Sequence, residues 1–334
     1  MDKIYIIAEI GMNHDGSLGQ AKMLAKAASE NGANAVKFQM HISEAETLKN
    51  APAPRYFTGE GRYEYFERTA FDFEQWLELK EYCKALKIDF IVSPFSIEAV
   101  DLLEKIGIDA IKIPSGEVTN IPYLEHISQC SSAPVILSSG MNTMQEVREA
   151  YDTLARNRRK VDVLQCTSEY PCRAEKLGLN IIEELKQIFP EARVGFSDHS
   201  DNIYSSILAV TKGAAIIERH FTLSRLMYGP DAYMSLEPTD LKELRKAVDY
   251  SQIALTSLVD KNDIREYSDM RITFQKSIVT GADLKKGDVI TKEVLAYKKP
   301  GSGIPAAQYK KLLGKKINKN LRKDSIISEE DIEW

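Results

Sequence analysis

Two stretches decide the fold prediction: GFSDHS at residues 195–200 and AAIIERHFT at residues 214–222. Each starts with an apolar run typical of a buried strand and ends in polar residues that include a histidine, and a helix-length segment separates them. In a parallel strand–helix–strand unit, both strands end at the same edge of the sheet. We therefore expect His199 and His220 to lie close enough to bind one ion or ligand. Each could instead be an ordinary hydrogen-bonded histidine near a strand end.

The alternation of strand and helix extends from the first residues to about residue 258. Apolar runs typical of strands lie at 4–10, 35–38, 89–92, 110–113, 134–137, 161–165, 193–196 and 214–217. Each run is followed by a segment with helical periodicity, and examples lie at 18–30, 73–86, 97–106, 144–156, 180–188, 202–211 and 239–258. Eight strand–helix pairs in roughly 250 residues predict a (β/α)8 TIM barrel. An open doubly wound sheet is the alternative, but no glycine-rich dinucleotide motif follows the first strand.

A smaller domain is predicted after the barrel. We assign residues 1–258 to the barrel, residues 259–275 to a polar, charged linker and residues 276–334 to a small β-rich domain. Two similar segments, LKKGDVITKEVL (284–295) and LRKDSIISEEDI (321–332), predict that this domain is internally duplicated. Because so short a segment buries a marginal core, we expect it to pack on a barrel, its own or a partner's.

The segment between Gln39 and Phe71 is long for a strand-to-helix loop. It contains two prolines and several aromatic residues, and such loops usually form lids or subunit contacts. The residues concerned are Pro52, Pro54, Tyr56, Phe57, Tyr63, Tyr65 and Phe66.

Charge and hydropathy argue against a nucleic-acid-binding or membrane protein. The net charge of −5 gives no reason to expect nucleic acid or an anionic membrane as a partner. No apolar run reaches membrane-spanning length, and the amino terminus, MDKIYIIAEIG, reads as a strand rather than a signal peptide, which predicts a cytoplasmic protein. The cysteines show no metal-binding spacing and are predicted to be reduced thiols. They are Cys83, Cys130, Cys166 and Cys172.

In a (β/α)8 barrel the active site forms at the carboxyl ends of the strands. Lysines, hydroxyls and backbone amides at these ends suit a phosphate and a carboxylate bound together. Two histidines and a carboxylate leave positions open on a catalytic divalent metal. Each residue alone could be a solvated charge, a structural ion-pair partner or a helix cap. The candidates are Glu9, Lys37, Gln39, Ser93, Lys112, Ser115, Glu117, Ser138, Ser168, Tyr170, Ser197, Asp198, His199, Glu218, Arg219, His220 and Asp231.

Eight motifs follow one another as they do in the sialic acid synthase family. They are EIGMNHDGS (9–17), AVKFQ (35–39), SPF (93–95), IKIPSGE (111–117), LSSGM (137–141), CTSEYP (166–171), GFSDHS (195–200) and ERHFT (218–222). The whole chain resembles this family, and its last segment resembles the antifreeze-like SAF domain, a β-clip fold. The resemblance implies condensation of phosphoenolpyruvate with an N-acylated amino-sugar aldehyde. It also implies a divalent metal (Mn²⁺, Mg²⁺ or Co²⁺) and a domain-swapped homodimer.

Residue roles are carried over motif by motif. The resemblance implies that His199 and His220 hold the metal and that Glu9 acts near it or on its water. The residues expected to act in catalysis are Glu9, Lys112, Glu117 and Asp231. Those expected to bind substrate are Lys37, Gln39, Ser93, Ser115, Ser138, Ser168, Tyr170, Ser197 and Lys299.

Two positions depart from the N-acetylneuraminate-forming members. Lys299 stands where an arginine typically reaches the sugar's N-acyl group, and a lysine lacks the planar donor fork. Gln275 stands where an aromatic residue often contacts the sugar. These differences favour legionaminic acid, made from 2,4-diacetamido-2,4,6-trideoxymannose. N-acetylneuraminate from N-acetylmannosamine and pseudaminic acid are the alternatives, a Schiff-base aldolase is a more distant one, and a non-catalytic carbohydrate-binding protein is the most distant.

Overall fold

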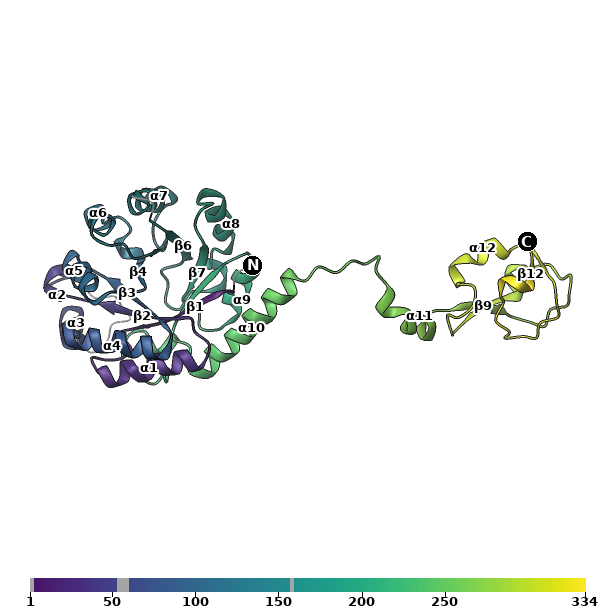
Figure 1. The fold of residues 1–334 in the computed structure, drawn as a ribbon, viewed down its shortest axis with the longest axis horizontal. Helices are drawn as coiled ribbons and strands as arrows, with labels where there is room; N and C mark the ends of the chain where they lie inside the picture. The colour runs from purple at the N-terminus through teal and green to yellow at the C-terminus, as the bar shows by residue number, and fades with distance from the viewer. Residues whose placement is uncertain (1–2, 53–59, 157–158) are drawn as a thin grey trace. The chain divides into compact units, whose positions relative to one another are not determined.

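The computed structural model describes residues 3–52, 60–156 and 159–334. The chain forms two compact units, Met1–Ser257 and Leu258–Trp334 (Figure 1). The predicted residues Pro54, Tyr56 and Phe57 lie outside the described ranges. No helix in the described ranges is long and apolar enough to cross a membrane.

The first unit is a closed parallel barrel of eight strands in sequence order, with the last strand paired to the first. The (β/α)8 prediction is therefore confirmed. The strands are β1 (Tyr5–Gly11), β2 (Ala35–Met40), β3 (Asp89–Pro94), β4 (Ala110–Ile113), β5 (Val135–Ser138), β6 (Val161–Cys166), β7 (Val194–Asp198) and β8 (Ile216–His220).

Helices surround the barrel, as Figure 1 shows. They are α1 (Leu18–Glu30), α4 (Phe73–Leu86), α5 (Ile97–Ile106), α6 (Ile121–Cys130), α7 (Met144–Leu154), α8 (Leu179–Ile188), α9 (Tyr204–Thr211) and α10 (Pro238–Thr256). Two further helices, α2 (Ser43–Glu46) and α3 (Arg62–Thr69), belong to the long segment after β2. Polar caps explain why the starts of α1, α4 and α5 agree with the sequence pattern: Ser17, Asp72 and Ser96 each accept a hydrogen bond from a backbone N–H of the first turn.

The strands extend beyond the apolar runs from which they were predicted. Strand β8 continues to His220 and pairs with β1 as far as Glu9, although its apolar run ends at Ile217. Strand β7 likewise continues to Asp198. The reason is that backbone pairing, unlike the hydrophobic pattern, does not depend on side-chain polarity. The polar residues at the rim are therefore held by the barrel's hydrogen-bond ladder.

An apolar layer fills the lower part of the barrel interior. Its side chains are Ile7, Ala35, Ile91, Ala110, Ile136, Leu164 and Ile216. Strand β7 places Gly195 next to this layer, where a Cβ atom would lie 2.5 Å from both the Ile216 carbonyl oxygen and a Leu164 methyl group. A larger residue at Gly195 would clash with both, because barrel interiors are close-packed. The interior is thus a packed core beneath the rim.

The second unit is small and contains two short antiparallel strand pairs. Strands β9 (Ser277–Thr280) and β10 (Leu295–Lys298) pair antiparallel, as do β11 (Lys316–Ile317) and β12 (Ile332–Glu333). The two similar segments adopt similar structures: Leu284 pairs with Leu321, and each segment continues through a 3₁₀ turn into a strand. The segment predicted as a linker contains helix α11 (Ser268–Phe274), which that prediction missed because the helix is polar and short.

Candidate active site

The rim residues form successive inward layers of the barrel. Side chains on a strand alternate between its two faces, so the residues two positions after the apolar layer also point inward. From β1 to β8 these residues are Glu9, Lys37, Ser93, Lys112, Ser138, Cys166, Ser197 and Glu218. Two positions further on, β7 and β8 lead to His199 and His220. A charged layer thus lies directly above the apolar layer, with the histidines above it.

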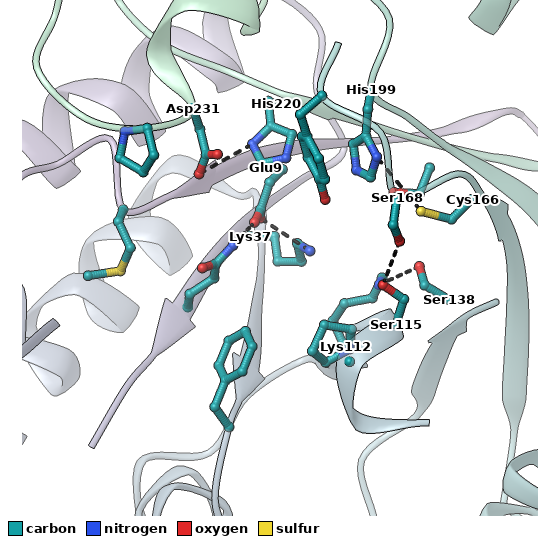
Figure 2. Close-up of a pocket in the computed structure, with 18 of the residues that line it drawn as sticks. Glu9, Lys37, Lys112, Ser115, Ser138, Cys166, Ser168, His199, His220 and Asp231 are labelled. Atoms are coloured by element: carbon teal, nitrogen blue, oxygen red, sulfur yellow. Dashed lines mark hydrogen bonds and ion pairs between the residues drawn. The ribbon is translucent and has the colours of Figure 1, made fainter. Parts of the chain in front are cut away.

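Buried charges of both signs pair with one another in the charged layer, where Figure 2 labels Glu9, Lys37 and Lys112. The Lys37 ammonium lies 3.1 Å from Glu218 Oε1 and 3.3 Å from Glu9 Oε2. The Lys112 ammonium donates to Ser138 Oγ at 2.7 Å and lies 3.8 Å from Glu218 Oε1. All four charged residues are at most 5% exposed. Such a cluster is costly to bury unless charges are paired, and it can hold an anion that reaches the lysines.

Burial and neighbouring charges give the ionisable groups of this cluster different pKa values. Burial raises the pKa of Glu9 to about 7, although Lys37 opposes this change. Burial also lowers the pKa of Lys112 to about 8. The pKa of Glu218 lies well below its usual value, because Lys112 and Lys37 outweigh the effect of burial. One carboxylate is therefore firmly charged, while Glu9 can exchange a proton near neutral pH.

Hydroxyl groups occupy the side of the site next to Lys112. Ser115 and Ser168 share a hydrogen bond between their Oγ atoms at 3.1 Å. Ser138 accepts from Lys112, and Ser197 donates to Glu218 Oε1 at 3.0 Å. The hydroxyls and the lysine make a surface suited to phosphate oxygens.

The two histidines face each other across neighbouring strand ends, with ring centroids 5.5 Å apart. His199 donates Nδ1–H to the Thr167 carbonyl at 2.9 Å, which leaves its Nε2 as a lone-pair donor. His220 Nδ1 is buried and makes no hydrogen bond to the described chain. Burial lowers the pKa of His199 to about 4 and that of His220 well below its usual value. Two neutral imidazoles with available lone pairs fit a divalent metal.

The two imidazoles would fill only two coordination positions of a metal ion, so most of its other ligands would be substrate or water. No third histidine, cysteine or acidic side chain among the described residues joins them in a three-ligand cluster. Asp231 Oδ2 lies 4.0 Å from His220 Nδ1, and burial raises the pKa of Asp231 to about 6. Tyr170 stacks on the His199 ring at a centroid distance of 4.2 Å. This arrangement leaves room for substrate and water on the ion, as a catalytic site requires.

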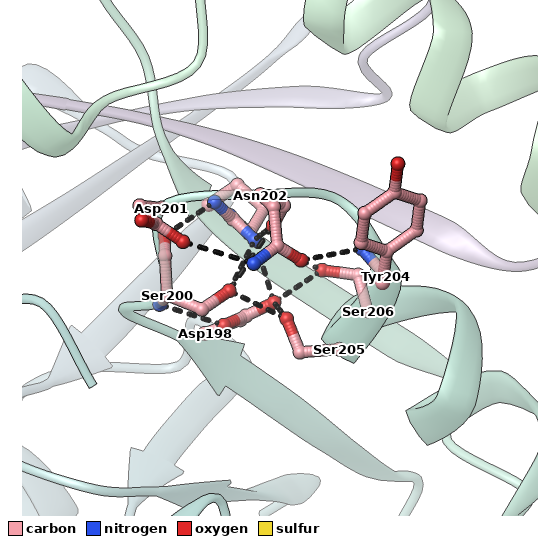
Figure 3. Close-up of polar contacts among 8 residues, drawn as sticks. Asp198, Ser200, Asp201, Asn202, Tyr204, Ser205 and Ser206 are labelled. Carbon is pink, nitrogen blue, oxygen red and sulfur yellow. Dashed lines mark hydrogen bonds and ion pairs between the residues drawn. The ribbon is translucent and has the colours of Figure 1, made fainter. Parts of the chain in front are cut away.

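A second buried network fixes the loop that carries His199 (Figure 3). Asp198 Oδ2 accepts hydrogen bonds from the Arg219 guanidinium at 2.6 Å and from the hydroxyls of Ser205 and Ser206. Arg219 also donates to the backbone carbonyls of Ser200 and Asn202, on the far side of the loop. The ion pair of Asp198 and Arg219 points away from the charged layer. Arg219 is therefore not a partner of Glu9, which pairs with Lys37 instead.

A cavity of about 400 Å³ opens above the charged layer. Two of the barrel residues with a predicted catalytic or binding role do not line it: Ser93 is buried in β3, and Glu117 accepts a hydrogen bond from Asn120. Lys299 belongs to the second unit, where its ammonium lies over the Phe274 ring, and its role stays a prediction. The predicted residues that line the cavity are Glu9, Lys37, Gln39, Lys112, Ser115, Ser138, Ser168, Tyr170, Ser197, His199, His220 and Asp231.

Several lining residues had no predicted role. Glu218 stood among the rim candidates, and its position two residues before His220 on the same strand could have placed it on the inward face. Arg62 and Phe66 come from α3, in the segment predicted to form a lid or a contact. His41 is stacked between Phe66 and Phe95, and its Nε2 lies 3.1 Å from Gln39 Oε1. No strand period marks His41, Arg62 or Phe66, because they come from the segment that follows β2 rather than from a barrel strand.

Comparison with known proteins agrees with this architecture. Residues 24–260 match the NeuB family, and residues 275–333 match the SAF domain. The N,N'-diacetyllegionaminic acid synthase of Campylobacter jejuni is 38% identical, with 98% of this chain and 100% of that protein covered. The protein of the same name from Legionella pneumophila is 36% identical, with 98% and 94% covered.

A solved structure shows the same likeness. The N-acetylneuraminic acid (sialic acid) synthetase of Leptospira borgpetersenii, crystallised with citrate, superposes with a TM-score of 0.71 at 30% identity. The match covers 82% of this chain and 93% of that one. From the barrel, the SAF unit and these relatives together, it follows that the chain is an enzyme that belongs to the NeuB family.

Proposed function

We propose that this chain condenses phosphoenolpyruvate with an N-acylated amino-sugar aldehyde to give a nine-carbon 2-keto sugar acid and phosphate. The observation that carries the proposal is the layering of the cavity, with two buried lysines and hydroxyls at its base and two neutral histidines above them. An acid bearing both a phosphate and a carboxylate fits the base. A neutral, oxygen-rich sugar fits the wider space above, next to Tyr170 and Asp231.

The residues at the base bind and orient the enol substrate. Lys112 and Ser138 would contact one anionic group, and Lys37 would contact the other, which holds the enol still for attack by its C3 on the aldehyde carbon. The attack uses the C2–C3 double bond and leaves C2 electron-poor, so water adds to C2 as it gives up a proton. The former aldehyde oxygen takes up a proton, and the tetrahedral intermediate expels phosphate, which carries away the C2 hydroxyl proton as the ketone forms. Glu9, with a pKa of about 7, is suited to take the proton from that water.

The buried, neutral imidazoles of His199 and His220 have available nitrogen lone pairs and so fit a metal ion between them. When bound by His199 and His220, a divalent ion such as Mn²⁺ supplies Lewis-acid polarisation of the aldehyde oxygen. Asp231, the acidic side chain beside His220, would orient the sugar or accept a hydrogen bond from one of its hydroxyls. The lysines stay charged binders in this scheme, since no covalent bond to the enzyme is formed.

We propose 2,4-diacetamido-2,4,6-trideoxymannose as the sugar, which makes the product legionaminic acid. The two relatives of that name, at 38% and 36% identity, support this choice. The replacement of the expected arginine and aromatic residue by Lys299 and Gln275 also supports it. N-acetylmannosamine is the main alternative, because the Leptospira structure bears the name of an N-acetylneuraminic acid synthetase. The precursor of pseudaminic acid is a third candidate.

Phosphate release from phosphoenolpyruvate should require both a sugar and a divalent metal. We expect faster release with 2,4-diacetamido-2,4,6-trideoxymannose than with N-acetylmannosamine, measured as kcat/KM in Mn²⁺ for both sugars. Equal values would count against the proposed sugar while leaving the reaction intact. No release with these two sugars or with the pseudaminic acid precursor would overturn the reaction itself.

The activity should decline at high pH. Below about pH 8 the Lys112 ammonium is charged and can bind the enol substrate, and above it the amine becomes neutral because burial lowers its pKa from 10.5. We therefore expect kcat/KM for phosphoenolpyruvate to fall about tenfold per pH unit above about pH 8. The profile should be recorded at a saturating sugar concentration and constant free metal. A flat profile to pH 9.5 would show that Lys112 does not set the activity.

A Schiff-base aldolase is the one alternative reaction that an observation favours. Such enzymes need a lysine with a lowered pKa, and Lys112 has one. The Lys112 ammonium, however, donates to Ser138, and the histidine pair would have no part in that chemistry. Borohydride reduction in the presence of 2-keto sugar acid distinguishes the two, because only the aldolase would be covalently trapped.

A further inference from the structure

Three metal-ligating side chains meet on the outside of the barrel, on neighbouring helices. Asp101 comes from α5, and His126 and Cys130 are one turn apart on α6. His126 Nε2 lies 2.7 Å from Asp101 Oδ1, and His126 Nδ1 lies 3.7 Å from Cys130 Sγ. One donor atom from each residue lies within 4.8 Å of the other two. No other group of three such side chains in the described parts of the chain is arranged in this way.

The cluster is separate from the active-site cavity. Helix α6 begins just after the rim residues Ser115–Glu117 and runs back along the barrel, so its last turn reaches the end where the strands begin. Cys130 closes that turn, and β5 follows it. None of the three residues lines the cavity. An ion bound here would leave the His199 and His220 site unaffected.

We propose that Asp101, His126 and Cys130 bind Zn²⁺, with water as a further ligand. A thiolate, an imidazole and a carboxylate together are the donors that zinc accepts in tetrahedral sites, whereas Mg²⁺ and Mn²⁺ prefer oxygen. With zinc–donor bonds of about 2.0 to 2.3 Å, tetrahedral geometry separates neighbouring donors by about 3.3 to 3.6 Å. The 3.7 Å between Sγ and Nδ1 is already close to this separation.

Small side-chain movements complete the site. One imidazole can offer only one nitrogen to a given ion, so the Asp101 carboxylate must move from Nε2 toward the sulfur. The Asp101 side chain is 52% exposed, so a change of rotamer moves it through solvent. His126 is 24% exposed, so the backbone of α6 sets its place more firmly.

The thiol distinguishes this cluster from an ordinary surface ion pair. Exposed ion pairs between side chains contribute about 0 to 1 kcal/mol and are common. A free cysteine is usually buried, as Cys83, Cys166 and Cys172 are here, whereas Cys130 is exposed and faces a histidine. Because the ligands come from two helices, a zinc ion would join α5 to α6 and stabilise the folded barrel by binding to it.

Cobalt provides a direct probe, since Co²⁺ occupies zinc sites and absorbs in the near ultraviolet when bound to a thiolate. The full chain, stripped of metal with a chelator under reducing conditions, should gain this absorption on titration with Co²⁺. Cys130→Ser should remove the absorption. It should also weaken Zn²⁺ binding by more than about tenfold, since even outer-shell changes cost 10- to 100-fold. Added Zn²⁺ should raise the melting temperature of the wild type by more than that of this variant, which keeps the His199 and His220 site but lacks the thiolate ligand.

Cys166→Ser is the matched control, because that thiol lies 3.9 Å from His199 Nδ1 in the active site. We expect it to keep the cobalt absorption, and we expect Cys130→Ser to keep the Mn²⁺-dependent activity. His126→Asn gives a second test in case the cysteine variant is poorly folded. Absorption that is absent from the wild type, or that depends on Cys166 rather than Cys130, would overturn the proposal.

Discussion

Replacing His220 by alanine should reduce phosphate release by at least about 100-fold, because it removes one of the two imidazoles that would hold the metal. Even the loss of an outer-shell partner of a metal ligand costs 10- to 100-fold in metal affinity or activity. The measurement is kcat/KM for phosphoenolpyruvate over a range of Mn²⁺ concentrations, together with Mn²⁺ binding by calorimetry. His199→Ala should behave in the same way, since the rings are neighbours.

His126→Ala is the matched control for this loss. That histidine lies on the outer helix α6 and does not line the cavity, so its removal should leave the Mn²⁺-dependent rate unchanged. Circular dichroism should show that all three variants are folded. If His220→Ala retained both its Mn²⁺ affinity and its rate, the assignment of the metal to this pair would be wrong.

Asp198→Ala should lower the free energy of unfolding by about 3–5 kcal/mol, because it leaves a buried guanidinium without its carboxylate. Arg219 is 2% exposed, and its hydrogen bonds to the Ser200 and Asn202 carbonyls cannot neutralise its charge. The hydroxyls of Ser205 and Ser206 would lose their acceptor at the same time. Urea denaturation of the full chain, followed by far-ultraviolet circular dichroism, measures the change.

Glu125→Ala controls for the loss of an ion pair as such. Its partner Arg156 is 59% exposed, so we expect a change within about 0.5 kcal/mol. A similarly small change for Asp198→Ala would mean that water or a rearranged loop compensates Arg219. Because this network fixes the loop around His199, Asp198→Ala should also weaken Mn²⁺ binding before the protein unfolds.

Much of the fold follows from patterns that sequence makes visible. Buried parallel strands read as apolar runs, and polar caps mark where α1, α4 and α5 begin. The barrel then brings the strand ends to one rim, which is why residues as far apart as Glu9 and His220 could be expected at one site. The strand period of two also relates the apolar layer to the charged layer above it.

Other parts of the site depend on the paths of loops and on tertiary packing, which the alternation of side chains along a strand does not predict. Arg62, His41 and Phe95 reach the cavity from loops and from a short helix, whose paths are set by packing. The pairing of Asp198 with Arg219 depends on which face each strand end presents, and the residue types alone do not show which carboxylate Arg219 contacts. The spacing of Cys130 from the other cysteines did not indicate a metal site. The residues beside Cys130 in the structure are a histidine of the same helix, His126, and an aspartate of another helix, Asp101, so cysteine spacing does not reveal them.

The apolar layer beneath the charged layer sets the order of events in the cavity. Isoleucine and leucine side chains close the barrel below Lys37 and Lys112, so a molecule seated on the lysines has no exit downward. It must arrive before the molecule above it and leave after that molecule has gone. For the proposed reaction this means an ordered sequence: phosphoenolpyruvate binds first, the sugar second, and phosphate formed at the base departs only after the sugar acid has moved aside.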